Sequence, residues 1–459
     1  MVEAIYTNRI LARVMLEAVT PLHVGTGSKS VLTDRVVGRD VNGLPYIPGT
    51  SLAGVLRHTL PAAEAATYFG TQRKNEEHGS LFLFSEARMV GKDGHAVDDM
   101  TSVDWNDDFY RHYRFLPIRQ HVGISHRGAA RPTAKFDEEV VMKGTRFVFD
   151  VEQISDTVHM DVMKHLLDAL ASRTFRIGGG TTKGFGHVSV VDIRLRAYDL
   201  TVAEDLQAYM DRSSSLSVPW QGSEPYVPTQ EKSRADMGLS YQLTLHPADF
   251  FLFGAGIGDD DADVKPVTES VATWSADGRP QVEEERTLIP ATSIKGALLH
   301  RSIYWYNKLH AVFADDMDPQ TMNHTVGCEC MESLFGKIGT NGSEQTRGRI
   351  RIDDIVEARP VYKVMNHVRI DRITGGTVNG ALFTEKATDG TGHEYTLHLD
   401  ILPGVNEEAV EAFEKALLDV CKGMLPLGGS VNRGCGMCQG VLLRNGVQVY
   451  PLNTDGNEN

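Results

Sequence analysis

The sequence predicts an α+β protein built of two tandem ferredoxin-like (RRM-like) domains. Its 459 residues are too many for one ordinary domain and suit two or three. A turn and helix start at residues 43–54 returns at residues 288–296, and a glycine cluster at residues 177–186 returns at 427–436. Around these markers each half reads roughly β-α-β-β-α-β. Markers that recur in the same order indicate a tandem duplication.

The first copy follows this pattern in order. Its opening strand alternates apolar residues with Arg13 and Glu17 and ends at Pro21, and a flexible glycine loop follows. After the helix that starts behind Ile47 and Pro48, the expected elements are a strand at residues 80–84, a long exposed hairpin at 111–131, a strand at 145–151, an amphipathic helix at 161–171, the glycine cluster and a last strand to Val191.

The second copy repeats these elements after a stretch of different composition. Residues 199–238 hold three prolines and a serine run, as linkers do. The second copy then brings an opening strand, a glycine loop, the helix start, a Phe-Gly pair, a hairpin at 367–372, a helix and the glycine cluster. We therefore expect domains at residues 1–198 and 239–450, a Pro/Ser-rich linker at 199–238 and a disordered tail at 451–459.

The composition is that of a soluble globular protein, with 41% hydrophobic and 23% charged residues. No apolar run approaches the roughly 20 residues that span a bilayer, and the N-terminal residues do not resemble a signal peptide. Four of the five cysteines are crowded as Cys328/Cys330 and Cys435/Cys438, unlike a secreted disulfide framework. We expect a cytoplasmic protein without membrane partners.

The net charge is −15, from 46 basic and 61 acidic residues. This balance argues against a protein that coats itself in nucleic acid by electrostatic attraction alone. Any phosphate binding must therefore be local, through backbone N–H groups and a few well-placed Lys and Arg side chains.

Both helix starts combine an apolar residue, a proline, a small residue and a Thr-Ser pair that we expect to cap the helix. A helix start with free backbone N–H groups is a natural anion site, and phosphate is the usual biological anion. Either copy alone is explained by a plain capped helix. Because the surroundings also repeat, we expect Ser51 and Ser293 to lie at phosphate sites.

The two glycine clusters are a second candidate for phosphate binding. They are neither a Walker P-loop nor a dinucleotide fingerprint, because each follows a helix and precedes a strand. Glycines such as Gly179 and Gly429 let the backbone approach a ligand, and Lys183 or Arg433 supplies one cation per loop. Each loop alone also fits a simple turn. Together with the helix starts, the loops predict a groove that follows a sugar-phosphate chain.

The order of glycine loop, aspartate, Ile-Pro-Gly-Thr-Ser-Leu-Ala-Gly, Phe-Gly, strand, hairpin and Gly-Gly-Gly-x-x-Lys-Gly-Phe-Gly resembles the RAMP superfamily of CRISPR-associated proteins. It is most similar to the backbone subunits of type III effector complexes. The stretch at residues 368–376 is similar to the thumb hairpin of that family. The resemblance covers nearly the whole chain, as two fused copies.

The resemblance implies that such subunits stack along a guide RNA, that target RNA pairs with the guide, and that other CRISPR effector subunits are partners. Sequence specificity would come from base pairing. Cleaving subunits of the family carry an aspartate in the loop before the Ile-Pro motif, where Asp34 lies. This carboxylate would accept the ribose 2′-OH proton or hold Mg²⁺ or another divalent cation. In the second copy Asp263 lies nearest, with Asp259, Asp260 and Asp261 as competitors.

The basic side chains expected to contact RNA come from the loops, helix starts and glycine clusters. They are Lys29, Arg35, Arg39, Lys183, Lys295 and Arg433. The side chains of the thumb hairpins expected to grip RNA or a neighbouring subunit are His121, His126, Arg127, His367, Arg369 and Arg372. For each of them, simple exposure to solvent is the alternative.

A structural Zn²⁺ site is a further candidate in the second copy. Cys328 and Cys330 follow His324 closely, and Cys/His clusters bind zinc. The C-x-C spacing is not the common one, and a fourth ligand is not obvious. Cys435 and Cys438 complete the site only if the fold brings them near, and a packing role suits them as well.

Three functions therefore stay open. The chain is a guide-RNA-binding subunit that cuts target RNA through Asp34 and perhaps Asp263, or an architectural subunit of the same complex without cleavage. The third is a stand-alone endoribonuclease that processes guide RNA, with His23 or another histidine near a glycine loop as acid/base.

Overall fold

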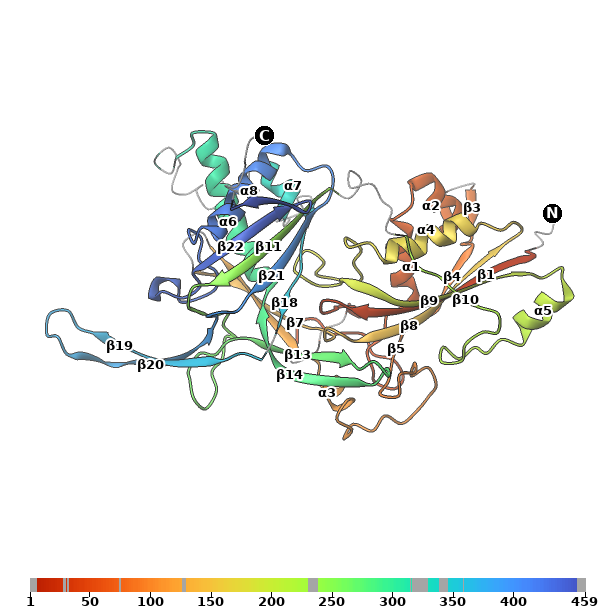
Figure 1. The fold of residues 1–459 in the computed structure, drawn as a ribbon, viewed down its shortest axis with the longest axis horizontal. Coiled ribbons are helices and arrows are strands. Elements are labelled where there is room, and N and C mark those ends of the chain that lie inside the picture. Colours follow the sequence, from red (N-terminus) through yellow and green to blue (C-terminus); the bar gives the residue numbers. More distant parts are fainter. Residues whose placement is uncertain are drawn as a thin grey trace, which may run out of the picture.

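The computed structural model describes residues 6–27, 30, 33–73, 76–125, 129–229, 238–313, 315, 329–337, 346–357 and 359–451. They form two α/β domains that lie next to each other along the long axis of the molecule (Figure 1). Both domains have the same arrangement, in which helices pack against an antiparallel sheet. Apart from Pro451, the predicted tail lies outside the described residues.

The sheet of the first domain has the strand order β10-β9-β1-β8-β4, with β5 beside β8. Its strands are β1 (Asn8–Ala18), β4 (Phe82–Phe84), β5 (Arg88–Met89), β8 (Arg146–Ser155), β9 (Val188–Asp199) and β10 (Glu224–Pro225). The helices and remaining short strands of this half are α1 (Gly49–Arg57), α2 (Ala62–Phe69), β2 (Thr71–Arg73), β3 (Glu76–His78), α3 (Arg111–Arg114), α4 (Met160–Leu170) and α5 (Ala203–Met210).

The sheet of the second domain has the order β17-β21-β11-β22-β23. Its strands are β11 (Leu239–Pro247), β17 (Ile350–Ile352), β21 (Tyr395–Ile401), β22 (Cys438–Arg444) and β23 (Val447–Tyr450). The other elements are β12 (Phe250–Phe251), β13 (Thr268–Trp274), β14 (Pro280–Ile289), α6 (Ala291–Leu309), α7 (Glu329–Phe335), β15 (Gly336–Lys337), β16 (Thr346–Arg347), β18 (Ile355–Val356), α8 (Glu407–Cys421) and the 3-10 turn η2 (Val431–Arg433).

The two sheets are built alike. In each, the first strand is central, the last strand lies on one side of it, and the third and second strands follow on the other side. Apolar side chains of one sheet face pack with α1, α2 and α4 in the first domain and with α6, α7 and α8 in the second. Burying these two cores is the main favourable contribution to folding. The duplication read from the sequence is therefore present in the fold.

The predicted linker is, in its larger part, a structured piece of the first domain. α5 lies against β9, and β10 pairs with the edge of β9. Trp220 is buried against Leu11 and Tyr198, and Tyr226 donates a 2.7 Å hydrogen bond to Asp168. The proline and serine content suggested an open chain, but these two aromatic side chains fix residues 199–229 to the sheet and to α4. Residues 230–237 lie outside the described part.

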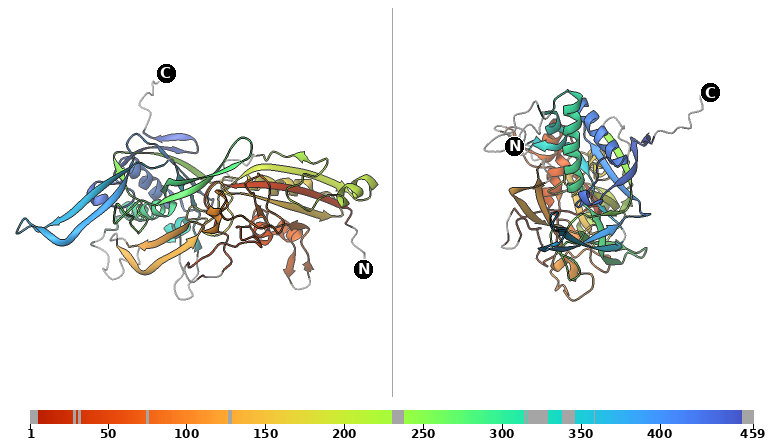
Figure 2. Two further views of the ribbon diagram at one scale, coloured as in Figure 1. Left: turned by 90° about the horizontal axis from the view of Figure 1, so that it is seen from below. Right: turned by 90° about the vertical axis from the view of Figure 1, so that its left-hand side faces the viewer.

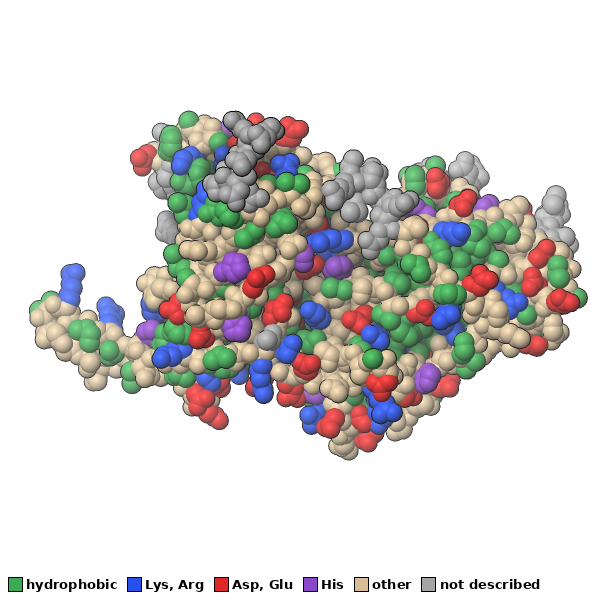
Figure 3. Space-filling view, viewed as in Figure 1, with side chains coloured by type: hydrophobic (Ala, Val, Ile, Leu, Met, Phe, Trp, Pro, Cys, Tyr) green, Lys and Arg blue, Asp and Glu red, His purple; other side chains and the backbone are tan. Residues whose placement is uncertain are grey.

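Each domain carries a long hairpin outside its sheet. In the first domain it is β6 (Ile118–Ile124) with β7 (Ala130–Glu139), and in the second it is β19 (Tyr362–Ile370) with β20 (Thr377–Asp389). Figure 2 shows the first hairpin in orange reaching beneath the second domain, whereas the second hairpin, in blue, projects away from the molecule. Basic side chains lie near the tip of this projecting hairpin (Figure 3).

Ion pairs join the two domains. Arg119 of β6 binds Glu269 of the second domain at 3.0 and 2.7 Å and Asp354 at 3.0 Å. Arg176 lies 2.7 Å from Asp353. Trp274 at the end of β13 also crosses the junction and donates a 2.7 Å hydrogen bond to the Gly144 carbonyl. The side chains of Arg119, Glu269 and Asp354 are at most 7% exposed, so this cluster is part of a protein interior.

Replacing Arg119 by methionine should strongly destabilise the junction. The change leaves two carboxylates buried side by side without their cation, and such a loss costs about 3–5 kcal/mol. Thermal or urea unfolding of the purified chain measures it. Arg111→Met is the matched control, because Arg111 is 53% exposed and pairs with Asp108 and Glu284 on the surface. A surface pair contributes less than about 1 kcal/mol. Equal, small effects of both changes would contradict the buried cluster.

Candidate functional site

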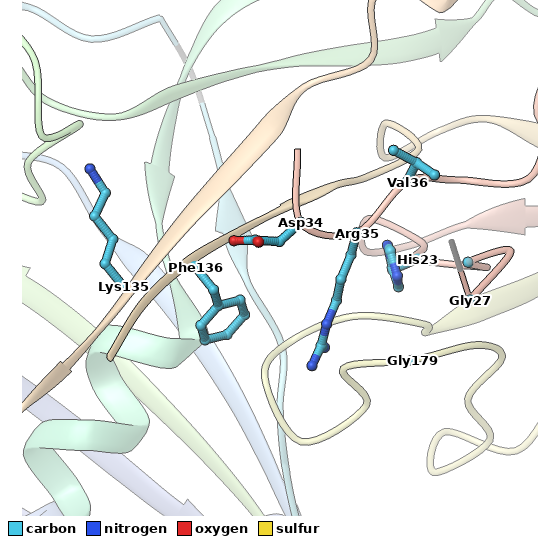
Figure 4. A pocket seen from close by; sticks show the side chains of 9 residues that line it. His23, Gly27, Asp34, Arg35, Val36, Lys135, Phe136 and Gly179 are labelled. Carbon is cyan, nitrogen blue, oxygen red and sulfur yellow. The ribbon is translucent and has the colours of Figure 1, made fainter. Parts of the chain in front are cut away.

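An open pocket of about 560 Å³ lies in the first domain between its N-terminal loop, the first hairpin and the glycine cluster. Figure 4 shows it from close by. The residues that line it are His23, Gly25, Gly27, Asp34, Arg35, Val36, Lys135, Phe136 and Gly179. The sequence predicted Asp34, Arg35 and Gly179 for this site, and weighed His23 only for a processing nuclease. Lys135 and Phe136 were missed, because the hairpin strand reaches the loop only through tertiary pairing.

Asp34 is exposed and held by the hairpin strand beside it. Its N–H donates to the Asp137 carboxylate at 2.8 Å, and its own carboxylate accepts from the Asp137 N–H at 3.3 Å. The next residue, Arg35, forms a parallel bridge with Glu138. Among the described residues, one carboxylate oxygen of Asp34 accepts a hydrogen bond, and that bond is long. The carboxylate lines the pocket together with Lys135 and Phe136 (Figure 4).

Phe136 forms an aromatic floor on which several polar side chains lie. The His121 ring stacks on it with 4.8 Å between centroids. The Arg35 guanidinium lies 5.3 Å from its centroid and the Lys183 ammonium 4.4 Å from it. Cations over an aromatic face are attracted by the ring quadrupole. The floor therefore gathers two cations, one from the N-terminal loop and one from the glycine cluster, at one place.

Beneath this floor lies Glu138, whose side chain is fully buried. Its carboxylate lies 2.8 Å from His121 Nε2, 3.2 Å from Lys183 Nζ and 3.5 Å from Arg35. Burial alone would raise the pKa of Glu138, but His121 and Lys183 outweigh it and lower this pKa to about 2. The ionised glutamate thus ties the hairpin to the glycine cluster.

The second domain repeats this cluster. The Asp263 carboxylate accepts from the N–H and the hydroxyl of Thr384 at 2.8 and 3.1 Å, and Val264 forms the parallel bridge with Glu385. Three side chains of the second domain repeat the arrangement around Phe136. His367 stacks on Phe383 at 4.9 Å, and Arg433 lies 5.2 Å above that ring and 2.7 Å from Glu385. Asp263, rather than its acidic neighbours, thus occupies the place of Asp34.

The two sites differ in the side chains around the aspartate. The Gly179 N–H donates to the His23 carbonyl at 2.7 Å, and the Gly429 N–H donates to the Leu252 carbonyl at 2.6 Å. Leu252 therefore stands where the first site has His23. By the same comparison of bridges, Val264 stands where the first site has Arg35. The second site lacks two nitrogen-bearing side chains.

Its surroundings are also acidic. Lys386 is engaged by Asp259 and Asp261 at 2.8 and 3.0 Å, and Asp263 follows in the same loop. Further carboxylates next to the aspartate repel a phosphate group. The first site is therefore the better anion site of the two.

A cluster of cations lies where the first domain's glycine cluster meets α6. Lys295 in the first turn of α6 lies near Lys183 and Arg351. Burial, together with Arg351 and Lys183, lowers the pKa of Lys295 to about 8. Burial, with Arg347 and Arg176 nearby, also lowers the pKa of Arg351 to about 10. The sequence predicted Lys183 and Lys295 here but missed Arg351, which an alternating strand pattern does not single out.

Lys183 is paired with Glu138, but the other two cations have no ion pair among the described residues. Within the described ranges, no carboxylate lies at ion-pair distance from Lys295 or Arg351. Arg351 donates to the carbonyls of Gly348 and Ile350 at 3.1 Å, and its buried Nε has no hydrogen-bond partner among the residues that the structure describes. A buried donor without an acceptor is unfavourable, and an added anion would satisfy it. This junction is suited to bind a phosphate.

The helix starts differ from the prediction. α1 and α6 begin at Gly49 and Ala291, with Pro48 and Pro290 at the N-cap and no side-chain cap. The Thr-Ser pairs thus lie in the first turn, because each proline already supplies the extended conformation before the helix. The Ala291 N–H donates to Asp354 at 2.7 Å, so a carboxylate of the chain already occupies the start of α6. Of the two predicted serines, Ser51 is half-buried and Ser293 is exposed.

The remaining predicted side chains have varied positions. Arg39 donates to the carbonyls of Gly43 and Tyr113 at 2.9 and 2.6 Å, and burial lowers its pKa, so it holds the loop together. Arg369 and Arg372 are exposed on the projecting hairpin. The predictions that lie outside the described residues concern Lys29, His126, Arg127, His324 and Cys328.

The predicted zinc site is described only at Cys330. Its sulfur lies 3.8 Å from the Tyr306 hydroxyl. In the described part of the chain, no three His, Cys, Asp or Glu side chains gather as metal ligands. Cys435 and Cys438 are buried, in line with a packing role. Zinc binding stays a prediction.

The fold and site define a duplicated α/β protein whose two domains repeat one cluster of a buried glutamate, a histidine, a phenylalanine and a basic side chain. The family model of the RAMP superfamily matches residues 15–189 and 274–439, which is well over half of the chain. The chain therefore belongs to the RAMP superfamily, whose proteins are CRISPR-associated and bind RNA. No curated protein shows a significant match to the sequence. Among the described helices, none is long and apolar enough to cross a membrane.

Lys295→Met should stabilise the RNA-free protein while weakening anion binding. The lowered pKa means that the charged ammonium costs stability at neutral pH, and a lowered lysine pKa of this size corresponds to about 1–3 kcal/mol. The cost is fully present below about pH 8, the folded pKa. It disappears above the unfolded pKa of about 10.4. Unfolding at pH 7 and pH 10 measures it, and the gain should shrink at pH 10.

The control for this experiment is Lys164→Met, because Lys164 is exposed on α4. This change should alter stability by less than about 0.5 kcal/mol at either pH. If Lys295→Met destabilises the protein at pH 7 as buried packing changes do, the cation cluster is not strained by its own charge.

Proposed function

We propose that this chain is a backbone subunit of a type III CRISPR effector complex, which binds guide RNA and cleaves the paired target RNA. The carrying observation is the exposed Asp34 carboxylate in a pocket with Arg35 and Lys135, next to a cation cluster in which Lys295 and Arg351 have no ion pair among the described residues. Each domain would serve as one ferredoxin-like RAMP unit, and each hairpin as a thumb that contacts RNA or a neighbouring subunit.

The guide RNA backbone would pass the junction of the two domains. Lys183, Lys295 and Arg351 would each meet phosphate oxygens there, with Gly179 allowing the RNA chain to come close, and Gly429 would do the same at the second glycine cluster. The proposal is supported by the missing counter-charges of Lys295 and Arg351. A net charge of −15 does not oppose it, because binding depends on local potential rather than on total charge.

The target strand would reach Asp34. In this reaction a ribose 2′-oxygen attacks the adjacent phosphorus in line, the bond to the 5′-oxygen breaks, and the products are a 2′,3′-cyclic phosphate and a 5′-OH. Arg35 and Lys135 would offset the negative charge that develops on the phosphoryl oxygens. The 2′-OH proton has to leave, and the Asp34 carboxylate can accept it or hold a divalent cation instead.

A Mg²⁺ ion would find one protein ligand at this place, the Asp34 carboxylate. Mg²⁺ is commonly bound through one or two carboxylates together with water and phosphate oxygens, so a site with Asp34 as its protein ligand is sufficient. Asp137 lies next to Asp34 and is the nearest second carboxylate. When bound, the ion would stabilise charge on the scissile phosphate. The second domain's Asp263 would be the weaker counterpart, because two donors engage its carboxylate and acidic side chains surround it.

Target-RNA cleavage by the reconstituted complex tests the proposal, with the wild-type chain compared with Asp34→Asn and Asp263→Asn in Mg²⁺ and in EDTA. We expect Asp34→Asn to slow one cut at least about 100-fold, the usual range for losing a proton-transfer or metal-binding group. Guide-RNA affinity should stay within about twofold, because Asn keeps the shape of the side chain. Asp263→Asn should have a smaller effect on a different cut.

Two other outcomes would support one of the two alternative functions. If both substitutions leave every cut unchanged, the chain is an architectural subunit without nuclease activity. If the isolated chain cleaves precursor guide RNA without partner subunits, it is a stand-alone processing nuclease. Zinc analysis of the purified chain, with Cys328→Ser and Cys330→Ser as variants, tests the proposed structural metal.

A further inference from the structure

His23 lines the same pocket as Asp34 but has a different position. In Figure 4 the two side chains lie on either side of Arg35. In-line displacement places the attacking and the leaving oxygen on opposite sides of the phosphorus. A phosphate bound in this pocket would meet both side chains, because both line it. Accepting the 2′-OH proton and holding a divalent cation are two roles that a single carboxylate cannot fill at once, and two side chains in one pocket can divide them.

The ring of His23 is fixed in one orientation. Its Nδ1 lies 2.7 Å from the Glu139 carbonyl oxygen, which can only accept a hydrogen bond. Nδ1 therefore carries the hydrogen, and Nε2 of the neutral ring keeps its lone pair. No partner engages Nε2 among the described residues. A histidine whose second nitrogen is held by an acceptor is the usual arrangement of a general base.

Glycines make room for this ring. A Cβ atom on Gly25 would lie 2.9 Å from Nε2, and one on Gly179 would lie 3.2 Å from the ring carbon Cδ2. Both glycines also line the pocket. Side chains at these two positions would crowd the nitrogen that faces the ligand. The duplicated site has no such group, because Leu252 stands in place of His23.

We propose that His23 is a catalytic residue of the first site, a role that rests on the proposed function. Its Nε2 accepts the proton of the attacking 2′-OH. The 2′-oxygen forms its bond to phosphorus, the bond to the 5′-oxygen breaks, and that oxygen takes a proton from water. His23 later returns its proton to solvent, so the reaction is balanced. Asp34 would then be left to hold the divalent cation. The second site has no equivalent base.

Single-turnover cleavage by the reconstituted complex tests this proposal with His23→Ala and His23→Asn. Asparagine can still donate to the Glu139 carbonyl, so it preserves the fold if alanine does not. Loss of a general base typically slows a reaction by about 10²–10⁴-fold. We expect such a loss at the cut made by the first site. The other cut and the affinities for guide and target RNA should change by less than about twofold.

Chemical rescue separates catalysis from a structural role. Imidazole in the buffer should restore at least tenfold of the lost rate to His23→Ala, and it should do nothing for His23→Asn. His95→Ala is the control, because His95 is exposed elsewhere in the first domain and should behave as wild type with or without imidazole.

Two results would overturn the proposal. One is a first cut that proceeds at the wild-type rate in both His23 variants. The other is a rate that falls only in proportion to RNA affinity and does not respond to imidazole, which makes His23 an RNA-holding residue. The Asp34→Asn variant shows which of the two proposals fails. If it stops the cut while the His23 variants do not, only the catalytic role of His23 is wrong. If it too leaves the cut unchanged, the proposed function itself fails.

Discussion

The architecture of both sites depends on one buried glutamate that is paired with a cation and a histidine. Glu138 joins the loop before α1, the first hairpin and the glycine cluster, which lie far apart in the chain. Glu385 does the same with His367 and Arg433. An ionised carboxylate cannot stay buried without such partners. The requirement for charge pairing therefore holds the pocket wall, its aromatic floor and the aspartate loop in register.

The second constraint is the close packing of the two domains head to tail. A Cβ on Gly184 in the first glycine cluster would lie 2.7 Å from both the Ala291 Cβ and an Asp354 oxygen. Only glycine fits there, because the loop lies directly on the start of α6. A Cβ on the equivalent Gly434 of the second domain would meet no atom of another segment within 4 Å in the described part of the chain. A head-to-tail arrangement leaves such a surface open at its end, which is compatible with a stack of subunits.

The charge distribution follows from the same packing. Acidic side chains outnumber basic ones, so the chain is negative overall. Lys183, Lys295 and Arg351 nevertheless converge at the domain junction. Their burial and mutual repulsion are unfavourable in the free protein, as the lowered pKa values of Lys295 and Arg351 indicate. Strain of this kind is typical of binding sites, since the ligand supplies the missing charge. A basic total charge is thus not needed for binding a polyanion.

The sequence by itself determined the duplication, the RAMP resemblance, the candidate Asp34 and the matching of Lys183 with Arg433. These features depend on local spacing and on repeated order. Tertiary structure alone decided the rest. Trp220 and Tyr226 turned most of an apparent linker into part of a domain, and Asp354 filled the start of α6. Arg351 and His23 gained their positions only when distant segments met. Burial and charge pairing between such segments leave no periodic trace in the sequence.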